Sequence, residues 1–344
     1  MIWLTWRQFR AQAITALVVL AAAAVYFVVS GLGMHHSYAA DLTSCTAQRD
    51  CANALSRLLG DYLAALNLTE TLLAAVPALI GIFWGAPLIG RELETGTHQV
   101  AWNQSVTRTR WLAVKLAGVG LAAIATAGVL SYLMTWWAGP LDQINGSRFG
   151  AMTFSTRDIV PLAYAAFAFA LGTTAGLLLR RTVPAMAVTL AVFIGVQILV
   201  PTTIRPNLLP STTVTYALDQ STLSQTNGIQ SQSGSGDFTM SGLTVPRGAW
   251  VLSTSPVESS SGRAVSLDSV QSCLPTPGTG GTVNGVQPFA RFGACVASDD
   301  LHESVTYQPA SNYWPLQWFE AGIFLALAAF LSGACFWWIR RRQS

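Results

Sequence analysis

Six long apolar stretches constrain this chain more than any other feature of its sequence. None of them contains a charged residue, apart from Glu320 near one end of the last. A helix that crosses a bilayer needs about 20 mostly apolar residues, because the hydrocarbon core is about 30 Å thick. Helices are required because unpaired backbone amides are too costly in lipid. The predicted spans are 13–32, 72–89, 116–138, 159–179, 183–200 and 319–339.

Composition excludes a single soluble domain. Only 10% of the 344 residues are charged and 51% are hydrophobic, whereas a soluble domain carries roughly 25% charged residues. We therefore expect an all-α polytopic membrane protein with six transmembrane helices. A small, partly β, disulfide-bonded extracytoplasmic domain is predicted between helices 5 and 6.

The flanking charges predict the orientation. Lys and Arg accumulate in short cytoplasmic loops, and most of the 19 basic residues lie in the short connections that share the side of the N-terminus. With six spans, both termini are then cytoplasmic and the chain lies in the plasma membrane. A cleavable signal peptide is not expected, because the first apolar run is longer than the roughly 7 to 15 residues of such segments. The basic residues placed inside are Arg7, Arg10, Arg91, Arg108, Arg110, Lys115, Arg180, Arg181, Arg340, Arg341 and Arg342.

The predicted organisation has four parts. Residues 1–12 form an amphipathic elbow helix, with Trp3, Trp6, Arg7 and Arg10 at the membrane interface. Residues 13–202 hold helices 1 to 5 and a cytoplasmic loop at 90–115. Residues 203–313 form the outer domain, with strands expected at 238–245, 250–254 and 304–307, and 314–344 form helix 6 and a basic tail.

Four of the five cysteines fall in predicted outer segments. Cys45 and Cys51 lie in the first outer loop, and Cys273 and Cys295 lie in the outer domain. Cysteines on the oxidising side of a membrane favour disulfides. Local pairing, Cys45 with Cys51 and Cys273 with Cys295, is the simplest arrangement, and a bridge between the two segments is the alternative.

The predicted spans contain few residues that could act in catalysis or bind a metal. None of the four histidines and no aspartate lies inside a span, and the phosphate-binding loop GxxxxGK[ST] is missing. We therefore expect no catalytic residue, no metal site and no cofactor on this chain, and no nucleic-acid partner. Glu70 and Glu320 are predicted to be interface residues, with a proton or cation site as the alternative. The pairs Gly81 with Gly85 and Gly172 with Gly176 are expected to pack within the chain rather than in a dimer.

The connection at 90–115 carries the most specific signal. Glu92 followed by Gly96 and Thr97 matches the pattern E-x-x-x-G-T, and the segment from Val100 to Ser105, which contains Trp102, fits a short amphipathic helix. This order resembles the first cytoplasmic loop of exporter-type (type-2) ABC transporter permeases, in which such a helix docks on the ATPase. The resemblance implies coupling roles for Glu92, Glu94, Gly96, Thr97, Val100, Trp102, Arg108 and Lys115.

The same resemblance implies a function. The chain would be the permease subunit of an ATP-driven exporter of a hydrophobic or amphipathic substrate, such as an antibiotic, a peptide or a lipid. ATP and magnesium would bind to a separate ABC ATPase subunit, and a second copy or a paralogous permease would complete the pathway in the lipid membrane. The segment 307–342 and the preference for Arg over Lys are similar to permeases of high-GC actinobacteria. A non-transporting sensor or immunity protein with a ligand-binding outer domain is the alternative.

Overall fold

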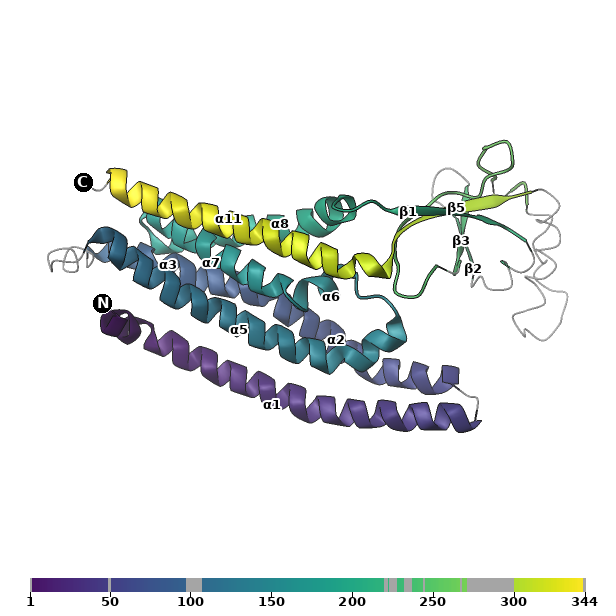
Figure 1. Cartoon of the computed structure of the whole chain (residues 1–344), viewed down its shortest axis with the longest axis horizontal. Helices are drawn as coiled ribbons and strands as arrows, with labels where there is room; N and C mark the ends of the chain where they lie inside the picture. The colour runs from purple at the N-terminus through teal and green to yellow at the C-terminus, as the bar shows by residue number, and fades with distance from the viewer. Residues whose placement is uncertain are drawn as a thin grey trace. The chain divides into compact units, whose positions relative to one another are not determined.

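The computed structural model describes residues 2–48, 51–96, 107–219, 222, 228–231, 237–243, 245–266, 268–270 and 300–342 (Figure 1). The chain forms two compact units. One comprises Met1–Leu208 with Tyr313–Ser344, and the other comprises Leu209–Asn312.

The first unit is helical. Within the described residues, six helical segments are long and apolar enough to cross a membrane, and each matches one of the predicted spans to within one residue or extends beyond it. The second segment is continuous, because α2 leads through the π-helix η1 into α3. The fifth consists of α8 followed by the two short helical segments η2 and η3. The helices are α1 (Ile2–Gln48), α2 (Cys51–Ile80), η1 (Gly81–Gly85), α3 (Ala86–Thr95), α5 (Arg108–Asn145), α6 (Ala151–Thr156), α7 (Val160–Leu179), α8 (Thr182–Leu199), η2 (Val200–Ile204), η3 (Arg205–Asn207) and α11 (Tyr313–Arg342).

Helix α7 is the core of this unit. In its most apolar window 72% of the residues are buried, against 6% in the corresponding window of α1. Its residues are almost all apolar or small, so every face can pack against another helix. Figure 1 shows α7 between α11 and α5, whereas α1 lies at the edge of the bundle.

Glycines set the distance between α7 and the second span. A methyl group added at Gly172 would lie 2.2 Å from the carbonyl oxygen of Gly81, and one added at Gly85 would lie 2.7 Å from that of Phe169. Gly176 meets the carbonyl of Ala86 in the same way, at 2.5 Å. The two glycine pairs therefore pack against each other within one chain, backbone against backbone.

The prediction of a loop between the first two spans is wrong, because α1 extends to Gln48 and α2 begins at Cys51. At 1.5 Å per residue α1 is about 70 Å long, more than twice the thickness of the hydrocarbon core. Apolar packing supports the extensions, since Met34 of α1 and Leu58 of α2 are buried in one cluster with Leu141 of α5.

The predicted disulfide bonds are not supported. Cys45 lies in α1 and Cys51 is the first residue of α2, rather than both in a loop, and their side chains lie outside the described ones. Cys273 and Cys295 also lie outside the described residues. The part of the chain that is described contains no disulfide, and Cys335 is a free, buried thiol.

The elbow predicted at 1–12 is continuous with the first span, since α1 begins at Ile2. The ring of Phe9 packs edge-on against that of Trp84 of η1, with 5.0 Å between centroids. Gln12 donates a hydrogen bond of 3.0 Å to the carbonyl of Phe83. The side chains of Trp3, Trp6 and Arg7 lie outside the described ones, and Arg10 is exposed.

The described part of the second unit contains five short strands in two antiparallel sheets. One sheet has the order β1-β5-β4 and the other pairs β2 with β3. A small apolar core forms beneath them, including Leu218, Phe238, Met240, Val257 and Leu301. The strands are β1 (Thr212–Ala217), β2 (Gly228–Ser231), β3 (Phe238–Ser241), β4 (Trp250–Thr254) and β5 (His302–Gln308).

A buried carboxyl group makes the stability of this second unit depend on pH. Glu303 of β5 is fully buried, and its two oxygens accept hydrogen bonds of 3.1 and 3.0 Å from the amide of Met240. Burial raises the pKa of Glu303 from 4.5 to about 7. Between these values the folded state binds more protons than the unfolded state, so stability falls as the pH rises.

We therefore expect the unit to lose up to about 3 kcal/mol of stability between pH 4.5 and pH 7.5. The measurement is hydrogen exchange of β3 and β5 peptides in the full chain, corrected for the intrinsic exchange rate. Glu303→Gln should flatten this pH dependence. An equally steep dependence in Glu303→Gln would show that another group is responsible.

Candidate functional site

The candidate coupling site begins where α3 ends. Gly96 caps this helix with a φ of 73°, a left-handed conformation that strongly favours glycine. Helix α3 therefore ends shortly after Glu92 and Glu94. Thr97, Val100 and Trp102 of the predicted site follow and lie outside the described residues.

Glu92 forms an ion pair with Lys115 of α5. The Lys115 side chain is only 3% exposed, and its ammonium group lies 4.9 Å from the centre of the Trp111 ring. A buried ammonium group needs a charged partner, because an unpaired charge is very costly away from water. The pair thus fastens the last turns of α3 to the start of α5.

Glu94 fastens the same end of α3 to α8. Its carboxylate accepts hydrogen bonds from the amide and the hydroxyl of Thr182, at 3.0 and 2.8 Å. Thr182 is the first residue of α8, and the N-cap residue Arg181 makes no side-chain cap. Glu94 therefore caps α8 from another helix, and its negative charge suits the positive end of the helix dipole.

The structure thus brings together part of the predicted site. Glu92, Glu94 and Lys115 lie at one junction of α3, α5 and α8, and Thr182 is a member that the sequence analysis missed. Arg108 is the first residue of α5 and is half-buried. The N-cap of this helix is Thr107, which accepts a hydrogen bond from the amide of Arg110.

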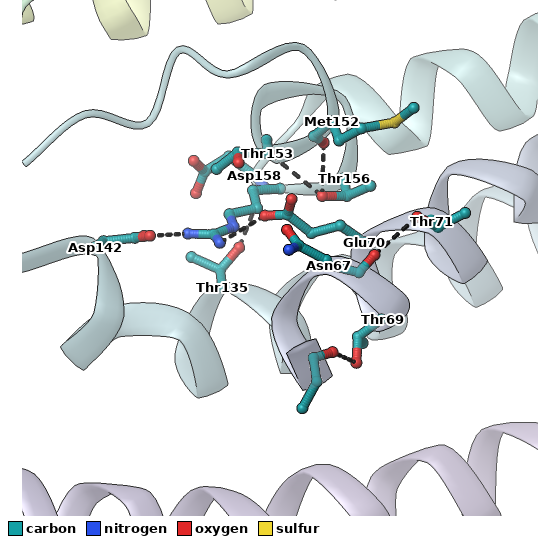
Figure 2. Close-up of polar contacts among 12 residues, drawn as sticks. Asn67, Thr69, Glu70, Thr71, Thr135, Asp142, Met152, Thr153, Thr156 and Asp158 are labelled. Carbon is teal, nitrogen blue, oxygen red and sulfur yellow. Dashed lines mark hydrogen bonds and ion pairs between the residues drawn. The ribbon is translucent and has the colours of Figure 1, made fainter. Parts of the chain in front are cut away.

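A second polar region lies near the other end of α5 and joins it to α2. Arg157 forms a 2.9 Å ion pair with Glu70 of α2 and a second ion pair with Asp142 of α5. Figure 2 shows Asp142 and Glu70 on two sides of this contact, with Thr135 and Asp158 beside it. Arg157 is 1% exposed, so one buried guanidinium joins α2, α5 and the turn before α7.

A third buried ion pair joins η3 to α11. Arg205 donates to both carboxylate oxygens of Glu320, at 2.8 and 2.9 Å, and to the Ser155 hydroxyl at 3.2 Å. Tyr164 of α7 donates its hydroxyl hydrogen to the same carboxylate. The Arg205 guanidinium also lies 4.0 Å from the centre of the Phe154 ring.

Both glutamates differ from their expected role as interface residues, because they are buried partners of arginines. Glu70 is 4% and Glu320 is 1% exposed. A usable signal was the presence of Arg157 and Arg205 on the side that the charge distribution otherwise leaves poor in basic residues near the spans. No group of three or more potential metal ligands occurs among the residues that were described.

Comparison with known proteins identifies the family. No curated protein matches the chain, and no solved structure does. The family model described as "ABC-2 membrane transporter related" matches residues 17–205, from α1 to η3, which is more than half of the chain. The matched region contains the α3, α5 and α8 junction. The chain therefore belongs to the ABC-2 membrane transporter related family.

Proposed function

We propose that this chain is the membrane-spanning subunit of an ATP-driven exporter and that a separate ABC ATPase subunit drives it. ATP and magnesium bind to that partner, and this chain contributes no catalytic residue. In this proposal both termini and the α3 end that carries Glu92 and Glu94 face the cytoplasm, where the ATPase is. Family membership and the six spanning helices support the proposal.

The junction at the end of α3 is the observation that carries it. A force applied to the segment after Gly96 acts first on α3, which is tied to α5 through Glu92 and to α8 through Glu94. We expect helices joined in this way to move together, because hydrogen bonds to charged groups are stronger than those between neutral groups. One docking segment could thus move the starts of three spanning segments.

The glycine contacts extend the same path to the core. Gly90 of α3 packs near Gly176, and η1 packs on α7 through Gly81 and Gly85. Close-packed backbones cannot slide independently without opening a void. Movement of α3 is therefore passed to α7, the most buried spanning helix.

We propose a hydrophobic or amphipathic substrate by analogy with exporters of this family. The ion pairs Arg157–Glu70 and Arg205–Glu320 lie toward the ends of the spans, and in each pair the two opposite charges meet within the chain. A second copy of the chain, or a paralogous permease, completes the pathway.

Isolation of the complex tests this function. The tagged chain, extracted in mild detergent from its native membrane, should retain an ABC ATPase subunit. The purified complex should hydrolyse ATP, and the chain expressed alone should not. Recovery of the chain without any ATPase, from cells that express all neighbouring genes, would contradict the proposal and favour the sensor or immunity function.

A further inference from the structure

An apolar cleft lies between α1 and α5, outside the junction described above. Its volume is about 690 Å³, within the usual range of small-ligand pockets. Small residues from both helices line it, and the larger side chains of Leu17 and Leu121 at its walls are mostly exposed. The small lining residues are Ala13, Ala16, Ala117, Gly118, Ala122 and Ala125.

Aromatic side chains pack near both ends of this cleft, Phe9 of α1 against Trp84 of η1 and Phe27 of α1 against Trp137 of α5. Small residues on two facing helices normally let the backbones approach closely. Here the ring centroids lie 5.0 Å apart in the first pair and 5.9 Å apart in the second. Between these contacts the wall of the cleft formed by α5 is open, because a side chain added at Gly118 would meet nothing within 4 Å.

The cleft selects an apolar occupant. Thr126, a polar residue on its wall, donates its hydroxyl hydrogen to the carbonyl of Ala122 at 2.8 Å. Because this hydroxyl already donates a hydrogen bond within α5, an occupant of the cleft needs no polar group to pair with it. The α1 residues that line the cleft also belong to a candidate membrane span, where the surrounding solvent is lipid. An acyl chain fits these properties.

Two arginines at one end of the cleft indicate the headgroup. Arg10 directly follows the lining residue Phe9, and Arg110 precedes the lining residue Val114 by four positions, so both lie at the end of the cleft formed by the starts of α1 and α5. Both are exposed. Arginine near a membrane surface attracts anionic lipid and binds phosphate well.

We infer that the α1–α5 cleft binds an anionic phospholipid from the leaflet at the N-terminal end of α1. One acyl chain occupies the cleft, and the headgroup phosphate lies at Arg10 and Arg110. The lipid fills a space that packing of the chain leaves open, and so it supports α1, the least buried span. This inference does not depend on the proposed transport function.

Native mass spectrometry of the purified full chain tests the inference. With added phosphatidylglycerol the wild type should retain one lipid more tightly than with phosphatidylcholine. Gly118→Leu, which fills the cleft, should weaken phosphatidylglycerol binding about tenfold or more. Gly322→Leu is the matched control, since a side chain at Gly322 of α11 also meets nothing within 4 Å but lies outside the cleft. It should bind lipid as the wild type does.

Arginine variants test the headgroup separately and leave the helix packing unchanged. Arg10→Gln and Arg110→Gln should each reduce the preference for phosphatidylglycerol over phosphatidylcholine by about fivefold. Wild-type retention in Gly118→Leu, or an unchanged preference in the arginine variants, would overturn the inference. A change from dimer to monomer in Gly118→Leu with unchanged lipid binding would also overturn it, because a second copy would then fill the cleft.

Discussion

Gly172→Val is expected to prevent the membrane unit from reaching its native packing. The first carbon of the new side chain would lie 2.2 Å from the carbonyl oxygen of Gly81 and 2.9 Å from the amide nitrogen of Ala86. Both are backbone atoms of the second span, so no side-chain rotation relieves the overlap. Separating α7 from η1 should cost about 3 kcal/mol or more.

The measurement is the amount of monodisperse chain after detergent extraction, together with its thermal unfolding. Gly195→Val on α8 is a matched control, because a side chain there meets nothing within 4 Å and the position is exposed. It should behave as the wild type does. Equal yield and melting of the Gly172 and Gly195 variants would show that the close approach of α7 and η1 is not required.

Arg205→Met is expected to cost about 3 to 5 kcal/mol, because it leaves the buried Glu320 carboxylate without its cation. The hydrogen bond from Tyr164 cannot neutralise that charge. Loss of the pair also separates η3 from α11, the two segments of the membrane unit next to the 209–312 segment in sequence. Unfolding in detergent, followed by heat or denaturant, provides the measurement.

A double variant distinguishes the stability contributed by the ion pair from that contributed by side-chain packing. Arg205→Met with Glu320→Leu removes both charges and keeps similar side-chain volume, so most of the lost stability should return. A double variant as unstable as Arg205→Met alone would show that packing of the guanidinium on Phe154, rather than the ion pair, is what matters.

The six spans and part of the coupling site were predictable from the sequence, because hydropathy and local spacing carry that information. Glu92 and Lys115 flank the same short connection, so their proximity follows from chain order. The extension of α1 and α2 beyond the membrane was not predictable in this way. It depends on which faces of the helices meet, as Met34 and Leu58 show, and hydropathy does not specify that.

The buried ion pairs were missed for a related reason. Arg205 and Glu320 are 115 positions apart, and either could serve as an interface residue alone. Only the fold brings η3, α6, α7 and α11 together around them. The Glu94 cap on Thr182 is a similar case, since it joins two helix ends that are 88 positions apart in the sequence.

The reconstituted complex with its ATPase tests most directly whether the end of α3 couples ATP hydrolysis to export. Glu94→Ala removes the tie to α8 at an exposed position, and Glu92→Leu with Lys115→Met removes the tie to α5 without leaving a buried charge. Asp61→Ala changes an exposed acid of α2 far from this junction and is the control.

The measurement is substrate-stimulated ATP hydrolysis, recorded beside export. We predict that both junction variants lower stimulation and export about tenfold at normal expression, while Asp61→Ala does not. Wild-type stimulation and export in both junction variants would contradict the account.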